Sequence, residues 1–348
     1  MKLVKPIIGI TMGDPAGIGP EIVAKVMENK EVYNICNQII VGDASAMKQA
    51  IHIAGVDLDV RPILEVTDAK FEYGTIDVFD LKNVEMDQLE HGKISAMAGN
   101  AAFEAVKKVI ELAMEKKIDA TVTGPINKEA INLAGHHFSG HTEIYAHFTN
   151  TRDFAMLLVS GNLRVIHVST HVSLRKACDL VKKDRVLKVI LLLNDACQQF
   201  GIEIPRIGVA GLNPHASDGG LFGWEEEREI IPAIEQARAK GLNVKGPLPP
   251  DILFPKAKGG CFDGCVAMYH DQGHIPFKFE GFIWNCEQGK MESIRGVNIT
   301  LGIPIIRVSV DHGTAFEIAG KGVANPESLI HAIEYAAKLA ANKKLSHY

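Results

Sequence analysis

Short runs of apolar residues recur along the chain and alternate with longer segments whose apolar residues follow a helical spacing. The strongest helical pattern covers residues 100–117, where alanine, valine and isoleucine form one stripe and lysines crowd the end. Strands are expected at 6–12, 38–42, 119–123, 154–159, 164–168, 206–210, 305–310 and in a run that ends at 267–269. Further helices are expected at 20–30, 184–200, 226–240 and 326–342. This alternation predicts an α/β protein with largely parallel sheets.

Composition narrows the class of protein. A chain of 348 residues is long enough for two domains or one large one. The 37 basic and 42 acidic residues give a net charge of −5, which excludes a nucleic-acid binder that works by bulk positive charge. No apolar run has the length of a membrane span. Cysteines number only 6, which is no disulfide framework at this chain length, so we expect a cytoplasmic protein.

Several expected strands end in polar, glycine-rich loops, and open α/β sheets bind ligands beyond the carboxyl ends of their strands. The first loop, Gly13–Glu21, has neither the G-x-G-x-x-G spacing of a dinucleotide fingerprint nor the Gly-Lys-Ser/Thr of a P-loop. From these residues alone a tight strand-to-helix turn is favoured, and a backbone surface that a cofactor approaches is the alternative. The last loop, residues 311–326, is long, polar and rich in glycine, which is typical of a functional loop.

Three of the strand ends carry a histidine. His171 follows the strand at 164–168, His215 follows the strand at 206–210, and His270 follows the run that ends at 267–269. Three imidazoles with an open fourth position are typical of a catalytic divalent-metal site. For any one of them a structural or solvent-facing role is the simpler interpretation, and their equivalent positions at three strand ends bring the two interpretations to about equal weight.

Two basic residues stand among apolar neighbours. Lys278 lies in His-Ile-Pro-Phe-Lys, and Arg307 ends the run Ile-Pro-Ile-Ile-Arg. Burying such charges is costly unless an anion accompanies them, so a phosphate or carboxylate on a small substrate fits both.

The loops also carry a resemblance. GDPAGIGPEI and HGTAFEIAGKGVANP resemble the first glycine loop and the adenosine-side cofactor loop of isocitrate and isopropylmalate dehydrogenases. Over nearly the whole chain, ITMGDPAGIGPEI, TGPINK, GHTEIYA, STHVSLRKA, AGLNPHASDGG and YHDQGHIPFK resemble the 4-hydroxythreonine-4-phosphate dehydrogenase family more closely. The resemblance implies the two-domain fold of those dehydrogenases, with the active site in the inter-domain cleft. We expect residues 1–125 and 300–348 to form a discontinuous cofactor domain, and 126–299 a metal, substrate and dimerisation domain.

The resemblance also implies roles for particular residues, a homodimer with shared active sites, NAD as the cofactor, and one divalent metal ion per site, whether zinc, magnesium, manganese, cobalt or nickel. The expected metal ligands are His171, His215 and His270. The expected substrate contacts are His141, Thr142, Lys278, Asn298 and Arg307. The expected cofactor contacts are Gly13, Asp14, Gly17, Gly19, His312, Gly313, Thr314, Ala315 and Asn325. Lys278, Asp251 and Asp271 are the candidates for catalysis or proton transfer.

The chain departs from the vitamin B6 members of this family between Lys278 and Gly296, where FEGFIWNCEQGKMESIR is longer than they lead us to expect. This segment resembles the branch that acts on D-threonate or D-erythronate 4-phosphate. The expected reaction is oxidation of the 3-hydroxyl followed by β-decarboxylation, which yields dihydroxyacetone phosphate and CO2. The alternatives are the 4-hydroxy-L-threonine 4-phosphate dehydrogenase of pyridoxal phosphate biosynthesis, an acyl- or phosphotransferase of the same fold, and a non-catalytic sugar-phosphate binding protein.

Overall fold

A computed structural model describes residues 5–287, 290–294 and 296–345. The chain forms two compact units: unit 1 combines Met1–Arg152 with Ile303–Tyr348, and unit 2 is Asp153–Gly302. Unit 1 is discontinuous, and residues 126–152, which we expected in the second domain, belong to it. The reason is packing, because α5 (Lys128–Leu133) and α6 (His141–Phe148) both contact α4 (Ala96–Met114) of unit 1.

The sheet of unit 1 is parallel throughout. Its order is β3-β4-β2-β1-β5-β14, and every neighbouring pair runs in the same direction. Its strands are β1 (Ile7–Thr11), β2 (Asn37–Gly42), β3 (Asp59–Ile63), β4 (Thr75–Asp80), β5 (Ala120–Thr123) and β14 (Arg307–Val310). The central strands are buried on both faces, in agreement with their unbroken apolar runs.

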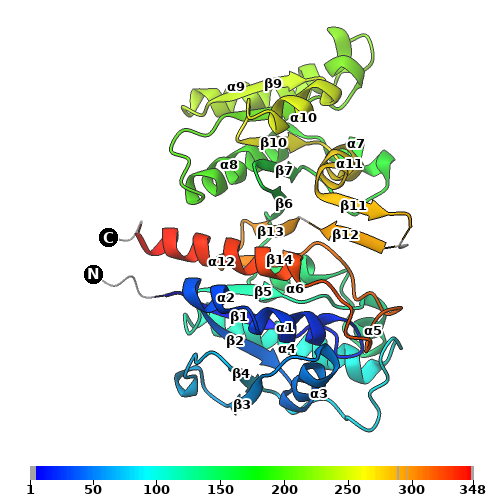
Figure 1. Cartoon of the computed structure of the whole chain (residues 1–348). Helices are drawn as coiled ribbons and strands as arrows, with labels where there is room; N and C mark the ends of the chain where they lie inside the picture. Colours follow the sequence, from blue (N-terminus) through cyan, green and yellow to red (C-terminus); the bar gives the residue numbers. More distant parts are fainter. Residues whose placement is uncertain (1–4, 288–289, 295, 346–348) are drawn as a thin grey trace. The chain divides into compact units, whose positions relative to one another are not determined.

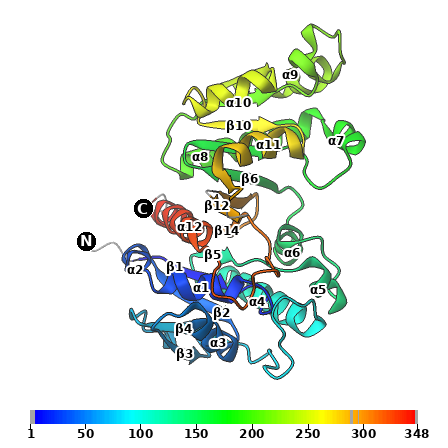
Figure 2. The ribbon, with the colours of Figure 1, turned by 45° about the vertical axis from the view of Figure 1, so that its right-hand side comes forward.

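Helices flank this sheet (Figures 1 and 2). α4 packs on β1, β2 and β5, while α12 packs on β5 and β14. Side chains begin several of these helices, since Asp43 accepts the backbone N–H groups of the first turn of α3, and Ser95 accepts that of Ala98 in α4. The remaining helices of the unit are α1 (Gly19–Met27), α2 (Lys30–Ile35), α3 (Ala44–Ala54) and α12 (Glu327–Leu345), with a 3₁₀ turn at Val66–Asp68.

The sheet of unit 2 has the order β13-β6-β7-β10-β8-β9. β6 runs antiparallel to both of its neighbours, whereas β7, β10, β8 and β9 are parallel to one another. Its strands are β6 (Ala155–Ser160), β7 (Leu163–His167), β8 (Ile207–Ala210), β9 (Val244–Leu248), β10 (Gly264–Ala267) and β13 (Val297–Leu301). A separate two-stranded antiparallel sheet joins β11 (Phe282–Asn285) to β12 (Lys290–Ile294).

Unit 2 has its own core, in which Leu158, Val165, Leu253, Cys265 and Phe277 pack together. Its helices are α7 (Leu174–Leu180), α8 (Lys183–Gln199), α9 (Ile231–Ala239), α10 (Pro250–Lys258) and α11 (His270–Gly281). Throughout the described ranges of both units, no helix combines the length and the apolar character that crossing a bilayer requires.

The structure differs from the sequence-based expectation in two places that matter for function. His270, expected in a loop, is the first residue of α11, a helix that contains Pro276 and that helical patterning did not reveal. The helix expected at 226–240 begins with a π-helical turn, Glu226–Ile230, before α9. Such turns are rare and are found frequently at functional sites.

Candidate functional site

Three neighbouring parallel strands of unit 2 carry the candidate metal ligands. β10 lies between β7 and β8, and all three run in the same direction. Their carboxyl ends therefore share one edge of the sheet. His171 follows β7, His270 follows β10 and His215 follows β8. The spacing in sequence is long, but the topology brings all three segments to the edge where α/β sheets bind ligands.

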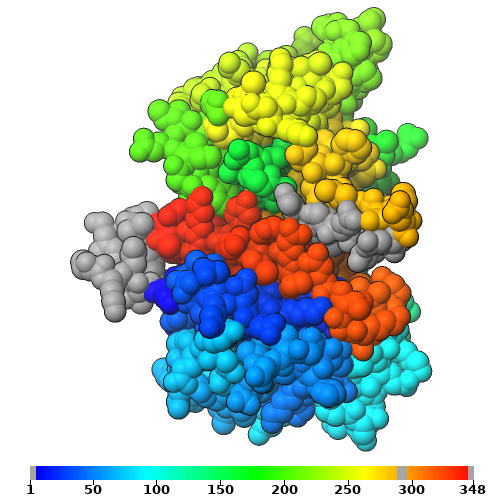
Figure 3. All heavy atoms as spheres, viewed as in Figure 1, coloured from blue at the N-terminus to red at the C-terminus, as the bar shows by residue number. Residues whose placement is uncertain are grey.

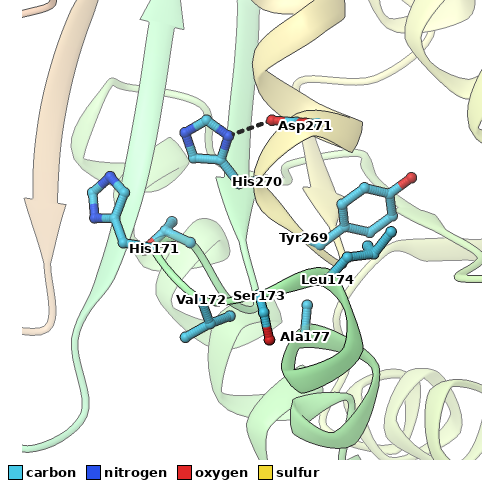
Figure 4. A pocket seen from close by; sticks show the side chains of 9 residues that line it. His171, Val172, Ser173, Leu174, Ala177, Tyr269, His270 and Asp271 are labelled. Atoms are coloured by element: carbon cyan, nitrogen blue, oxygen red, sulfur yellow. Dashed lines mark hydrogen bonds and ion pairs between the residues drawn. The ribbon is translucent and has the colours of Figure 1, made fainter.

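His171 and His270 line a common pocket of about 410 Å³ (Figure 4). Their ring centroids are 5.7 Å apart. The remaining lining residues are Thr170, Val172, Ser173, Leu174, Ala177, Tyr269 and Asp271. The two imidazoles lie in the upper part of the view in Figure 4, above the first turn of α7.

His270 is held on two sides. Its Nδ1 is 2.7 Å from Oδ1 of Asp271, and its ring stacks on that of His274 with centroids 3.6 Å apart. Nδ1 of His274 in turn faces the carbonyl oxygen of His270 at 3.0 Å. Burial lowers the pKa of His274 to about 4 and that of His167, behind it, to about 3. Both rings are therefore neutral near pH 7 and pack as uncharged aromatic groups.

His215 lies in an unusual turn. His215, Ala216, Ser217 and Asp218 have φ values of 55°, 54°, 73° and 43°, which form a left-handed stretch without glycine. Each residue in this region costs about 1–3 kcal/mol, so neighbouring contacts must hold the turn. Nδ1 of His215 is 3.2 Å from Oδ2 of Asp218, and the imidazole is exposed.

The donor chemistry of these histidines fits a divalent metal ion. A carboxylate faces Nδ1 of both His270 and His215, which leaves Nε2 as the atom able to bind a metal. In the described part of the chain, however, no group of three or more histidine, cysteine, aspartate or glutamate side chains lies close enough to hold an ion. The structure thus brings His171 and His270 together and leaves His215 apart from them. Their role as ligands stays a prediction.

The candidate anion site of unit 1 is built around Arg307. This side chain is 2% exposed, and its Nη2 donates to Oγ1 of Thr123 at 3.0 Å. Its guanidinium lies 5.4 Å from the ring centroid of Tyr145, whose hydroxyl donates to Thr121. Burial lowers the pKa of Arg307 to about 10, so the side chain keeps its charge near pH 7. The sequence did not point to Thr121 or Thr123, because the pairing of β14 with β5 brings them to Arg307. It did not point to Tyr145 either, because that residue comes from α6.

His141 begins α6 in the same unit. Its pKa is held well below the usual value, first by burial and then by the charges of Arg307 and Lys128. These three basic side chains therefore act on one another, an arrangement that favours a bound anion. Nε2 of His141 has no hydrogen-bond partner among the described residues, and Thr142, the next residue of α6, is half-buried.

Two expected cofactor loops contact each other in unit 1. The amide of Ile18 donates to the carbonyl of Thr314 at 3.0 Å. A Cβ at Gly17 would lie 2.9 Å from Cβ of Thr314, and one at Gly19 would lie 2.3 Å from the carbonyl oxygen of Met12. Gly13, with φ +78°, turns the chain at the end of β1. Glycine is therefore required at these three positions by close approach and backbone shape, whatever binds there.

The remaining expected cofactor residues lie around these loops. Asp14 is fully buried, and burial raises its pKa to about 6. Nδ1 of His312 lies 2.9 Å from the carbonyl oxygen of Gly313, and Gly313 is exposed. The backbone of Ala315 is left-handed, with φ 42°. Asn325 accepts the amide of Glu327 at 2.8 Å, so its side chain helps to begin α12.

Two charged side chains of α1 hold the loop at residues 320–324, and no sequence pattern pointed to either of them. Glu21 is buried and accepts the amides of Gly320 and Gly322, while Nζ of Lys25 donates to the carbonyls of Gly322 and Ala324 at 2.7 and 2.8 Å. Because the two residues lie four positions apart, they share one face of the helix. Figure 3 shows this loop, in orange, against the blue surface of the N-terminal segment.

The other expected site residues belong to unit 2 and lie apart from the loops of unit 1 in sequence. Lys278 is half-buried on α11, with Nζ 4.8 Å from the ring centroid of Phe282. Asn298 lies on β13, and its Oδ1 is buried without a hydrogen-bond partner in the described ranges. Asp251 is exposed in the first turn of α10. Residues 288, 289 and 295 of the long segment after Lys278 lie outside the described residues.

Comparisons with known proteins point to one family. The family model described as "Pyridoxal phosphate biosynthetic protein PdxA" matches residues 34–336. A curated protein of Oceanobacillus iheyensis, named "Putative D-threonate 4-phosphate dehydrogenase", is 50% identical over 97% of this chain and 99% of its own length.

Solved structures give the same result. A 4-hydroxythreonine-4-phosphate dehydrogenase from Klebsiella pneumoniae is 42% identical, has a TM-score of 0.85, and the match covers 97% of this chain and 100% of that one. Another, from Burkholderia phymatum, is 46% identical with a TM-score of 0.82, and covers 96% of this chain and 98% of its own.

Proposed function

Because the chain belongs to the PdxA family, whose members are named dehydrogenases, it is an oxidoreductase acting on CH–OH groups, and we propose that its substrate is D-threonate or D-erythronate 4-phosphate. Two observations, one in each unit, carry the proposal: unit 2 has histidines at three adjacent strand ends, and unit 1 has a buried arginine beside His141. The first suits a hydroxy acid that binds a metal, and the second suits a phosphate or carboxylate. The names of the curated relatives support the choice of acid.

The proposed reaction oxidises the 3-hydroxyl. That hydroxyl loses its proton, and its carbon transfers a hydride to NAD. The resulting β-keto acid loses its carboxyl group as CO2, and protonation of the remaining enolate gives dihydroxyacetone phosphate. A divalent metal held by His171, His215 and His270 would supply positive charge next to the reacting oxygens, which favours both steps.

The side chains of the protein orient the substrate. Arg307 provides a charged guanidinium fixed by Thr123, and neutral His141 can donate or accept one hydrogen bond beside it. Lys278 and Asn298 offer further donors to the phosphate or carboxylate. Asp271 holds the ring of His270 by facing the Nδ1 atom of that ring. NAD is proposed to bind at the two loops that meet at Ile18 and Thr314.

We propose a homodimer as the active form. Unit 2 leaves several large apolar side chains exposed, including Phe279 at 90% and Trp284 at 58%. Phe279 belongs to α11 and Trp284 to β11, both downstream of His270. Exposed apolar groups of this kind mark contact surfaces. We propose that a second copy covers them.

The test compares three acids in one assay. NADH formation is followed with D-threonate 4-phosphate, D-erythronate 4-phosphate and 4-hydroxy-L-threonine 4-phosphate, and the organic product is identified. The proposal predicts rapid turnover of one of the first two and release of dihydroxyacetone phosphate. A clear preference for the amino acid would contradict it and would place the enzyme in pyridoxal phosphate biosynthesis.

A further inference from the structure

One buried carboxylate organises the loop that carries His215. Glu226 is only 3% exposed and is the first residue of the π-helical turn. Its Oε1 accepts the amides of Leu212 and Asn213, each at 2.7 Å, and its Oε2 accepts Nδ2 of Asn213 at 2.8 Å. Both oxygens of this buried carboxylate thus accept hydrogen bonds from Leu212 and Asn213, in the loop after β8.

The loop beyond Asn213 needs such an anchor. Positive φ values run without a break from His215 to Asp218 and continue through Gly219 and Gly220. L-residues prefer right-handed conformations, so this stretch persists only where its surroundings determine it. Oγ of Ser217 donates to the carbonyl of Gly223 at 2.6 Å, which ties the far side of the turn to the segment leading back to Glu226.

Packing around the carboxylate is close. A Cβ at Gly211 would lie 2.8 Å from Cα of Ala216 and 3.0 Å from Oε1 of Glu226. The left-handed turn and the Glu226 carboxylate therefore both pack against Gly211, directly after β8. Only glycine at position 211 leaves room for this packing.

We propose that Glu226 is a positioning residue that fixes the conformation of the loop carrying His215, an expected metal ligand; this inference rests on the proposed function. Loss of the carboxylate leaves the amides of Leu212 and Asn213 without acceptors. The turn then relaxes toward right-handed conformations, and the imidazole of His215 loses its fixed position in the loop after β8. Glu226 touches neither substrate nor metal in this account and acts through the backbone of residues 212–215.

The test uses cobalt(II) as the probe. Metal-free enzyme is titrated with Co²⁺, and the visible absorption of the bound ion reports both affinity and ligand geometry. Glu226→Ala should weaken Co²⁺ binding by about 10–100-fold and change the spectrum. Glu226→Gln places an amide N–H against Nδ2 of Asn213 and should weaken binding by about tenfold. Glu227→Gln, at an exposed neighbouring carboxylate, is the matched control and should bind like the wild type.

A readout without metal accompanies the titration. Amide hydrogen exchange of the peptide covering residues 211–220 should be faster in both Glu226 variants than in the control. If Glu226→Ala does not fold, Glu226→Gln decides the question. Folded variants that keep the Co²⁺ affinity and spectrum of the wild type would overturn the inference.

His215→Ala separates this inference from the proposed function. If that variant binds Co²⁺ as the wild type does, the ligand role of His215 itself fails. If it loses affinity while the Glu226 variants retain theirs, the ligand role stands and only the positioning role of Glu226 is refuted.

Discussion

Burial determines which charges the candidate site carries near pH 7. Arg307 keeps its charge at a pKa of about 10 although it is surrounded by β5, β14 and α6, whereas His141 beside it is neutral because burial and two cations hold its pKa down. The sequence pointed to Arg307 because apolar residues flank it. Tyr145, Glu21 and Glu226 escaped notice, since their importance depends on contacts with residues far away in the chain.

We expect the charge of Arg307 to serve substrate binding and not folding. Replacement by methionine fills a similar volume and removes a buried cation, which often leaves stability unchanged or raises it. We expect Arg307→Met to raise KM for the phosphorylated acid by about 10–100-fold, since hydrogen bonds to charged groups contribute about 1.5–3 kcal/mol. Steady-state kinetics and thermal unfolding measure the two effects. Arg152→Met, at an exposed position, is the control, and a wild-type KM in Arg307→Met would refute the role.

Asp14 makes stability depend on pH. Its folded-state pKa of about 6 exceeds the ordinary 3.8, so the folded protein binds this proton more tightly than the unfolded chain does. The stability that protonated Asp14 contributes is fully present below about pH 4. It is lost as the pH rises through about 6, which lowers the free energy of unfolding by about 3 kcal/mol. Asp14→Asn should therefore gain stability relative to the wild type between pH 4 and pH 7.

Denaturant unfolding of the cofactor-free protein at both pH values measures this gain. Asp57→Asn, at an exposed carboxylate, should show none. A difference between Asp14→Asn and the wild type that is the same at pH 4 and pH 7 would show that the Asp14 carboxyl titrates normally.

At the scale of elements, apolar periodicity located the buried strands and long helices well. β1, β2, β5, β7, β8 and α8 lie within one or two residues of their expected bounds. The edge strand β3, its neighbour β4 and helix α11 were missed. β3 carries mixed polarity, and α11 contains Gly273 and Pro276. The left-handed turn after β8 has no propensity signal either. In our proposal the turn depends on the carboxylate of Glu226, which comes at least eight positions later in the chain.

The contact between α1 and the loop at 320–324 predicts an effect on cofactor binding. Lys25→Met removes two hydrogen bonds from a charged donor to the carbonyls of Gly322 and Ala324. The loop should become more mobile, and the Kd for NAD should rise about tenfold, which corresponds to about 1.4 kcal/mol. Isothermal titration calorimetry measures it, with Lys338→Met on exposed α12 surface as control. Unchanged NAD affinity would mean that this loop does not contact the cofactor.

At the scale of the whole molecule, the resemblance led us to expect a discontinuous first domain, and the structure divides the chain into a discontinuous unit 1 and a continuous unit 2. The difference at residues 126–152 arises because α5 and α6 belong with α4, a packing relation that no local pattern reveals. Strand order predicted that His171, His215 and His270 share one edge of the sheet, and the structure places His171 beside His270. The position of His215 depends on the conformation of its loop, which strand order does not encode.

The exposed apolar residues of unit 2 predict the assembly state. Phe279→Ser combined with Trp284→Ser should convert a dimer into a monomer and reduce turnover, because the proposed active form shares its sites. Size-exclusion chromatography with light scattering gives the mass in solution. Ile204→Ser, which also removes an exposed apolar group, should leave the dimer intact. A wild-type protein that is monomeric and fully active would contradict the prediction.

The central claim is that histidines at the ends of β7, β8 and β10 hold a divalent metal that the dehydrogenase requires. The most direct measurement is NADH formation from D-threonate 4-phosphate by chelator-treated wild type and by His215→Ala, each before and after divalent metal is restored. We predict that the treated wild type is inactive and recovers with metal, while His215→Ala stays inactive although it remains folded by circular dichroism. Full activity of the wild type after metal removal, or of His215→Ala at any stage, would contradict the account.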